Sequence, residues 1–377
     1  MNGVGIVTAR DSFAIDDDKN ALINKIRLFK NCKDPDEQLH LLFNINKKKG
    51  WSIRKAWNEL QKIDDSDIEK CIVPITYRLF DQRWIFYHDA IVWRTVKQIM
   101  RHIMQPNLGL ISTRFVFRKE YGFQHAFVTD SILDINQLQS PGTAQIFPLY
   151  LYDGGKQGDL FEKNSKNIRS QNLADKLWDY LGPDYIGHAL PEDIFNYIYA
   201  ILYSNTYRQK YQEFLKTDFP RIPFTSDYKL FQIIAELGKQ LIDLHLLNSP
   251  ELDAPISKFY GKDNNRVDGV RYEPIKISTG WMDRIKAGLD EWEWKDYGGI
   301  LFINDKQFFS GVTEEMWNYY IGGYQVLHKW LKDRKGQELS SEEIKHYCKI
   351  VTAIKSTIDL QKQIDEFYPE VEKNLIK

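Results

Sequence analysis

Arginine and aromatic side chains alternate along residues 79–120 of this sequence. The stretch places Arg83, Arg94, Arg101, Arg114 and Arg118 among Trp84, Tyr87, Trp93 and Phe115. Arginine binds guanine O6 and N7 bidentately, Asn and Gln bind adenine N6 and N7, and all three also bind phosphates. The stretch therefore indicates contacts with DNA. The alternative is that Arg83 and Asp81 form a structural ion pair and that the aromatic side chains belong to the core.

The positive charge is local, because the whole chain has a net charge of −1 from 51 Lys plus Arg and 52 Asp plus Glu. Residues 71–121 carry eight Lys or Arg against three acids, and residues 324–336 carry four against one. Nucleic-acid binding needs clustered positive charge. We therefore expect weak non-specific affinity, with contacts confined to a groove between these two basic segments.

Motifs for catalysis are absent from the sequence. It contains no G-x-x-x-x-G-K-[ST], no H-E-x-x-H and no Asn/Asp-Pro-Pro-aromatic element, and no two histidines lie three or four residues apart. We expect no catalysis from this chain alone. One alternative is a metal-dependent, nuclease-like site made from Asp159, Glu162 and Lys163. Another is an aromatic-lined module for carbohydrate or protein binding, suggested by 10 Trp and 21 Tyr.

Composition also limits where the protein works. The 377 residues have 43% hydrophobic content and include three cysteines far apart in sequence. This pattern predicts a folded protein of a reducing compartment without a disulfide framework. The chain has no apolar run of membrane-spanning length and no signal-peptide pattern at its start. We therefore expect a cytoplasmic protein with no membrane partner.

Apolar periodicity predicts an α+β fold. Residues 4–8 read as a strand that we expect to pair with an upstream segment, and residues 16–70 read as helices. Residues 72–152 form a mainly antiparallel β-sheet portion, interrupted by a helix over 96–104, and a loop covers 153–172. Helical and mixed portions follow, with Pro191 in the first turn of one helix, an N-cap at residues 225–227 and strands within 258–312. A long C-terminal helix carries an apolar stripe from Ile344 to Ile358.

Five sequence blocks are similar to a known family. They are LFDQRWIFY (79–87), MRHIMQPNLGLISTR (100–114), FPLYLY (147–152), NTYRQKYQEFLKTDFPRIPF (205–224) and IGGYQVLHKWLKDRKG (321–336). In this order they resemble the C-terminal specificity domain of type ISP restriction-modification enzymes and related adenine-specific DNA methyltransferases. The resemblance covers about residues 70–365. The opening GVGIVTARD resembles the end of the methyltransferase domain of those enzymes.

This resemblance implies a target recognition domain that positions double-stranded DNA for N6-adenine methylation and cleavage by upstream domains. It implies that residues 1–70 are the tail of an upstream methyltransferase domain and a helical connector. Residues 71–377 would form the recognition domain, in one or two lobes (71–172, β-rich; 173–377, helical and mixed). S-adenosylmethionine, Mg²⁺ and ATP would serve the upstream domains, and no cofactor is expected in this chain. The expected partners are DNA and the methyltransferase domain of the same polypeptide.

The family-like blocks also supply candidate residues for DNA contact or for support of the reading surface. These are Arg83, Arg101, His102, Asn107, Arg114, Arg208, Lys210, Arg221, Lys329, Arg334 and Lys335. Arg334 and Lys335 are expected to bind phosphate, whereas Lys329 has the alternative of lying on a solvated helix face. Removing one phosphate contact should lower the salt slope of binding by roughly one unit.

Overall fold

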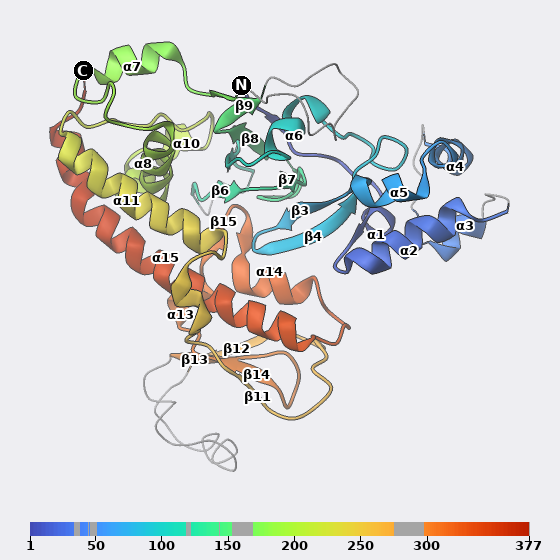
Figure 1. Cartoon of the computed structure of the whole chain (residues 1–377). Helices are drawn as coiled ribbons and strands as arrows, with labels where there is room; N and C mark the ends of the chain where they lie inside the picture. Colours follow the sequence, from blue (N-terminus) through green and yellow to red (C-terminus); the bar gives the residue numbers. More distant parts are fainter. Residues whose placement is uncertain are drawn as a thin grey trace, which may run out of the picture. The chain divides into compact units, whose positions relative to one another are not determined.

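Figure 1 shows the computed structural model of the chain, which describes residues 1–33, 38–43, 45, 51–117, 122–142, 144–152, 169–274 and 298–376. The chain divides into two compact units. The first contains Met1–Phe115, His125–Tyr180 and Thr217–Phe219. The second contains Val116–Gln124, Leu181–Lys216 and Pro220–Lys377.

Short apolar runs of the first unit form an antiparallel sheet in the order β1-β8-β5-β6. Its strands are β1 (Gly3–Val4), β8 (Gln145–Pro148), β5 (Gly109–Ser112) and β6 (Ala126–Thr129). Gly3 and Val4 pair with Ile146 and Gln145 of β8. β8 therefore supplies a partner for the first strand from within this chain, and an upstream partner stays a prediction.

A second four-stranded sheet of this unit has the order β2-β4-β3-β7. Its strands are β2 (Ile15–Asp16), β4 (Asp81–Phe86), β3 (Ile72–Arg78) and β7 (Ile132–Leu133), and a separate pair joins β9 (Tyr150–Tyr152) to β10 (Arg169–Gln171). The Thr76 hydroxyl of β3 lies 2.6 Å from Thr129 Oγ1 and 2.8 Å from Ser131 Oγ, all buried. These hydroxyls satisfy one another where β3 meets the end of β6.

The helices of the first unit include those predicted within residues 16–70 and over 96–104. They are α1 (Asp11–Ala14), α2 (Lys19–Lys30), α3 (Gln38–Leu42), α4 (Ile53–Gln61), α5 (Asp65–Ile68), α6 (Lys97–Ile103) and α7 (Asp175–Leu181), which reaches the unit boundary. A 3₁₀ turn covers Glu69–Cys71. The helix predicted over 96–104 is thus confirmed as α6. The assignment of residues 1–70 to an upstream domain stays a prediction.

Helices dominate the second unit. They are α8 (Pro191–Tyr203), α9 (Asn205–Lys210), α10 (Gln212–Leu215), α11 (Tyr228–His245), α13 (Glu314–Trp317), α14 (Val326–Lys332) and α15 (Ser341–Lys373), with a 3₁₀ turn at Pro250–Asp253. Pro191 begins α8, and Asp227 caps α11 by accepting hydrogen bonds from Lys229 N and Leu230 N. Both start signals and the long C-terminal helix are confirmed.

The strands of the second unit form a sheet in the order β11-β14-β13-β12 and a small hairpin. They are β11 (Phe259–Tyr260), β12 (Arg271–Pro274), β13 (Gly299–Phe302), β14 (Phe308–Ser310), β15 (Tyr320–Ile321) and β16 (Tyr324–Gln325). The α+β fold with several antiparallel sheets is therefore as predicted. Among the described residues, no helix is both long and apolar enough to cross a membrane.

Helices α8, α11 and α15 pack together, and Figure 1 shows α11 (yellow) beside α15 (red). Gly238 allows α11 to approach α8 closely, because a Cβ at that position would lie 1.9 Å from the carbonyl oxygen of Asn196. Behind this contact, Tyr199 Oη lies 2.6 Å from His245 Nδ1, and His245 Nε2 lies 3.0 Å from Thr357 Oγ1. All three helices thus contribute to one buried polar chain.

Replacing Gly238 with alanine should destabilise the second unit. Alanine usually stabilises a helix interior relative to glycine, by about 1 kcal/mol. Here the new methyl group meets the backbone of α8, so overpacking should cost about 1–3 kcal/mol instead. Denaturant unfolding of the full chain measures the difference. The neighbouring exposed Lys239→Ala is the control and should change stability little; equal effects would contradict the close-approach explanation.

His245 should make stability fall below about pH 6.5. Burial lowers the pKa of His245 from 6.5 to about 3, with a smaller contribution from Arg208. The unfolded chain therefore binds a proton that the folded chain does not. The stabilisation is present above pH 6.5 and is lost progressively as the pH falls toward 3, with a limiting slope of about 1.4 kcal/mol per pH unit.

The measurement is the pH dependence of the unfolding free energy between pH 5 and 7. His245→Gln should lose a large part of the slope in this window, whatever its absolute stability. The exposed His188→Gln should keep the slope. An unchanged slope in His245→Gln would refute the assignment.

Candidate nucleic-acid interface

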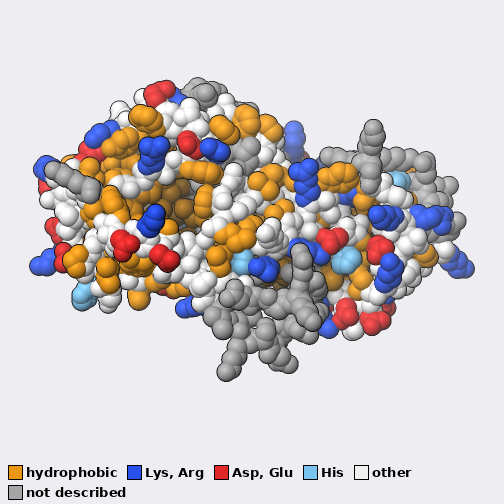
Figure 2. Space-filling view, turned by 90° about the horizontal axis from the view of Figure 1, so that it is seen from above, with side chains coloured by type: hydrophobic (Ala, Val, Ile, Leu, Met, Phe, Trp, Pro, Cys, Tyr) orange, Lys and Arg blue, Asp and Glu red, His pale blue; other side chains and the backbone are white. Residues whose placement is uncertain are grey.

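Residues 90–119 contain no Asp or Glu. They carry six cations, which are Arg94, Lys97, Arg101, Arg114, Arg118 and Lys119. In the first unit this segment includes α6 and β5, and its described part ends in the loop between β5 and β6. Figure 2 shows one face of the molecule, with basic (blue) and acidic (red) side chains dispersed among apolar ones. Along the sequence, the acid-free segment is a local concentration of positive charge in a nearly neutral protein.

Helix α6 separates an apolar face from a polar one. Ile99, Met100 and Ile103 are buried, and the helical repeat places Lys97, Gln98 and Arg101 on the opposite arc. Gln98 and Arg101 are exposed, while Lys97 forms an ion pair of 2.5 Å with Asp89. Gln and Arg are side chains that hydrogen-bond base edges. Sequence reasoning missed Gln98, although its position three residues before Arg101 in an amphipathic helix was the available signal.

Asn107 fixes the junction between α6 and β5. Its Nδ2 donates to the carbonyl oxygens of His102 (3.0 Å) and Tyr150 (2.8 Å). Its Oδ1 accepts from Leu108 N (2.9 Å) and Tyr150 N (3.0 Å). Because the amide is committed to backbone groups, Asn107 holds the α6 surface in place. It is not available for base contact while these bonds persist.

His102 is also structural. It lies on α6 but is buried, and its Nδ1 accepts a hydrogen bond of 3.0 Å from Tyr152 N of β9. The side chain therefore attaches α6 to the β9 strand. Of the two roles expected for His102, DNA contact and support of the reading surface, its position fits support.

The far end of β5 is held by a buried amide. Gln139 Nε2 donates to the carbonyl oxygen of Phe115 (2.9 Å), and Gln139 Oε1 lies 3.0 Å from His125 Nε2. Thr113 Oγ1 donates to the same Phe115 oxygen at 2.9 Å. Next to this anchor, Arg114 is exposed and forms a half-exposed ion pair with Asp218, at 3.0 Å. The loop thus presents an arginine on a fixed main chain.

Arg83 forms the structural ion pair with Asp81 that the sequence offered as an alternative to DNA contact. Its guanidinium forms ion pairs with Asp81 (2.9 Å) and Asp17 (3.1 Å) and lies over the ring of Tyr77. Burial by itself lowers the pKa of Arg83, but the attraction and hydrogen bond of Asp81, together with Asp17, raise it above the ordinary value. The positive charge is therefore already neutralised, which argues against a role in DNA contact.

Two candidate arginines of the second unit are buried. Arg208 is 9% exposed, donates through Nε to the carbonyl oxygen of Leu202 (2.6 Å) and lies over the ring of Tyr203. Arg334 is 5% exposed, bonds to Glu343 at 2.9 Å and lies 3.6 Å from the ring centre of Trp330. The expectation that Arg334 binds phosphate conflicts with this burial. Both arginines serve the packing of the unit.

The other candidates of this unit lie at its surface or close to it. Lys210 forms an ion pair with Glu372 at 2.6 Å, and Lys329 forms one with Asp333. Arg221 and Lys335 are exposed. In the first unit, the structure brings Arg101, His102 and Asn107 together around α6, with Arg114 beyond the other end of β5. A role in DNA contact stays a prediction for these residues.

The nuclease-like alternative falls outside the described part of the chain, because Asp159, Glu162 and Lys163 lie between residues 153 and 168. Within the described ranges, no group of three or more His, Cys, Asp or Glu side chains is placed to hold a metal ion.

Comparison with known proteins gives one family and several similar folds. The family model for the Type ISP C-terminal specificity domain matches residues 1–363. A search of curated proteins found no match.

Solved structures with a similar fold include two Type ISP restriction-modification enzymes and a DrdV–DNA complex. One is a nuclease-deletion mutant of the Type ISP enzyme LlaGI in complex with a DNA substrate mimic, with a TM-score of 0.58, 16% identity, 97% of this chain covered and 32% of that chain. A second is the ATP-dependent Type ISP enzyme LlaBIII bound to DNA, with a TM-score of 0.64 and 18% identity; the match covers 96% of this chain and 23% of that chain. A third is a DrdV–DNA complex, with a TM-score of 0.59 and 17% identity; the match covers 98% of this chain and 35% of that chain. This chain therefore spans about a quarter to a third of those chains, and the likeness shows a shared fold.

Arg334→Ala should destabilise the protein, whereas Lys335→Ala should not. Loss of Arg334 removes a buried charge-assisted hydrogen bond to Glu343 and the stacking on Trp330, at a cost of about 2 kcal/mol. Lys335 is exposed next to it. Thermal unfolding of the two variants makes the comparison. A stable Arg334→Ala protein would contradict the structural role of this side chain.

Proposed function

The chain belongs to the family of Type ISP C-terminal specificity domains, and we propose that it binds duplex DNA and recognises a short sequence in it. The observation that supports this most directly is the acid-free segment 90–119, on which α6 exposes Gln98 and Arg101. The fold is shared with chains described as bound to DNA or to a DNA mimic. Positive charge attracts the phosphates, and amide and guanidinium groups distinguish the base edges.

Helix α6 is the proposed reading element. The major groove of B-DNA is about 12 Å wide and admits an α-helix, whose diameter with side chains is about 10–12 Å. Gln98 and Arg101 would contact base edges from the exposed arc. Lys97 and Arg114 would contact phosphates after exchanging Asp89 and Asp218 for the DNA backbone. Exposed ion pairs are weak, so this exchange has a small cost.

The second unit would add phosphate contacts through its exposed cations. Arg221 and Lys335 have exposed side chains. Lys210 and Lys329 would first have to leave Glu372 and Asp333. The total number of phosphate contacts is therefore expected to be modest, which agrees with a net charge of −1.

Catalysis would belong to other domains of a longer polypeptide. We propose that a methyltransferase domain of the same polypeptide flips and methylates an adenine once this chain has fixed its register on the duplex. S-adenosylmethionine, Mg²⁺ and ATP would be used by those domains. The described residues offer no observation that favours the nuclease-like alternative.

Arg101→Ala should weaken binding to the recognised sequence by about tenfold, the effect of losing one good contact to a base edge. The recognised sequence is first selected from a pool of random duplexes, and fluorescence anisotropy then gives the affinities at several salt concentrations. Arg54→Ala, at an exposed position on α4, is the matched control and should bind like the original protein.

The proposal requires affinity that falls with salt. Binding that is absent at low salt, or that does not depend on salt, would refute the proposed function. Equal losses in Arg101→Ala and Arg54→Ala would refute α6 as the reading element while leaving DNA binding in place.

A further inference from the structure

We infer that Phe115 is a wedge that inserts its ring at a base step of bound duplex DNA and unstacks it. This inference rests on the proposed function. Phe115 follows the last residue of β5 by three positions, in the loop that leads to β6. Phe115 is 52% exposed. A large apolar side chain held in solvent, within a basic segment, requires an explanation.

The main chain at Phe115 is fixed although its ring is exposed. Its carbonyl oxygen accepts hydrogen bonds from Thr113 Oγ1 and from Gln139 Nε2, both 2.9 Å long. Thr113 and Gln139 are buried. The main chain at the ring is therefore anchored by two buried side chains of the first unit. Such a ring is presented to a partner with little loss of conformational entropy on binding.

The charge around Phe115 fits a nucleic acid. Arg114 lies 5.9 Å from the Phe115 ring centre and carries the half-exposed ion pair with Asp218. Further along the chain, Arg118 and Lys119 follow in the sequence, and the nearest acid before Phe115 is Asp89. Proteins that insert apolar side chains between base pairs place cations beside them to hold the flanking phosphates. Arg114 is suited to that role.

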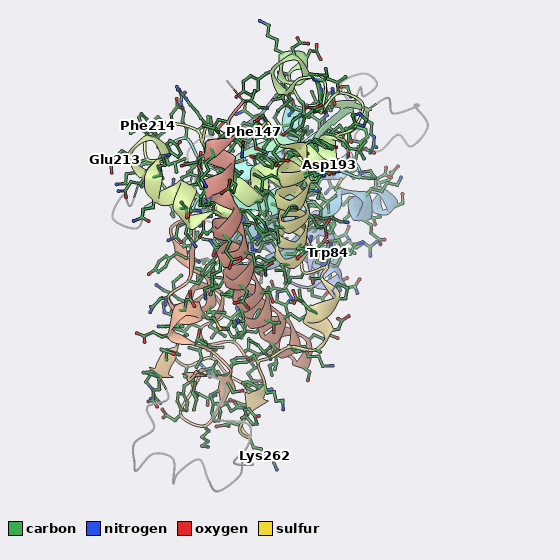
Figure 3. The ribbon with its side chains drawn as sticks, turned by 90° about the vertical axis from the view of Figure 1, so that its left-hand side faces the viewer. Trp84, Phe147, Asp193, Glu213, Phe214 and Lys262 are labelled. Atoms are coloured by element: carbon green, nitrogen blue, oxygen red, sulfur yellow. The ribbon has the colours of Figure 1, made fainter. Side chains whose placement is uncertain are left out.

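A second exposed aromatic side chain, Phe214, shows that exposure alone does not indicate insertion into DNA. Phe214 of α10 is 76% exposed, and Figure 3 shows Phe214 and Glu213 projecting outward from that helix. Glu213 forms an ion pair with Lys216 and places a carboxylate beside the ring. Each ring adjoins an ion pair, but the residue next to Phe214 is an acid that is 77% exposed and repels phosphate, whereas the residue next to Phe115 is an arginine. Phe214 therefore serves as a matched control.

The experiment uses 2-aminopurine, a fluorescent adenine analogue that brightens when it is unstacked. It is placed at each position in turn of the selected duplex, and the full chain is added. The original protein should raise the fluorescence several-fold at one position. Phe115→Ala should bind about tenfold more weakly, because the contact of the ring with the bases is lost, and should give no rise, because the base step stays stacked. Phe115→Leu should retain part of the rise, and Phe214→Ala should behave like the original protein.

Each other outcome decides against the inference. If the Phe115→Ala protein keeps both the affinity and the fluorescence rise, Phe115 is not a wedge, and the proposed function is unaffected. An original protein that binds DNA without any rise at any position overturns the inference as well. Equal losses in Phe115→Ala and Phe214→Ala would show a general effect of removing exposed rings and overturn it. An original protein without affinity for DNA overturns both proposals. Thermal unfolding checks that Phe115→Ala is folded, as expected for an exposed ring.

Discussion

Two amide side chains hold the ends of the short strand β5, and the proposed interface depends on them. Asn107 joins the last turn of α6 to the start of β5 and to β9 through four backbone hydrogen bonds. Gln139 holds the loop beyond the other end through the carbonyl oxygen of Phe115. A buried polar group without a partner is costly, so neither junction can open cheaply. The exposed arc of α6 and the loop after β5 are therefore positioned on one rigid strand.

The charge distribution of the chain is uneven, because residues 90–119 contain no Asp or Glu. Exposed or half-exposed cations have a carboxylate partner both outside residues 90–119, such as Lys210 with Glu372, and inside them, such as Lys97 with Asp89. Within the segment, Gln98 and Arg101 stand on a helix arc without an acid of its own. A nearly neutral protein can thus carry a local attraction for phosphate. Its affinity for DNA would come from few contacts, which favours sequence-dependent over general binding.

The sequence was sufficient for most elements and insufficient for most of the site. Spacing of apolar residues predicted α6 and α15, since a helix with one buried face has a period that can be counted. It could not separate exposed from buried arginines. Arg83 contacts Asp17, which is distant in sequence, and Arg334 bonds to Glu343 of α15 once α14 and α15 pack. The amide of Asn107 looks the same in sequence whether it contacts a base or a carbonyl group. These differences arise only from tertiary contacts.

The anchoring of residue 115 through its carbonyl oxygen has a consequence for how such a protein diversifies. Every residue type has this oxygen, so the bonds from Thr113 and Gln139 persist whatever side chain follows. The same holds for exposed positions 98 and 101, where no core packing constrains the residue type. A lineage could therefore acquire preference for a new target by substitution at these three positions while the scaffold beneath them keeps its sequence.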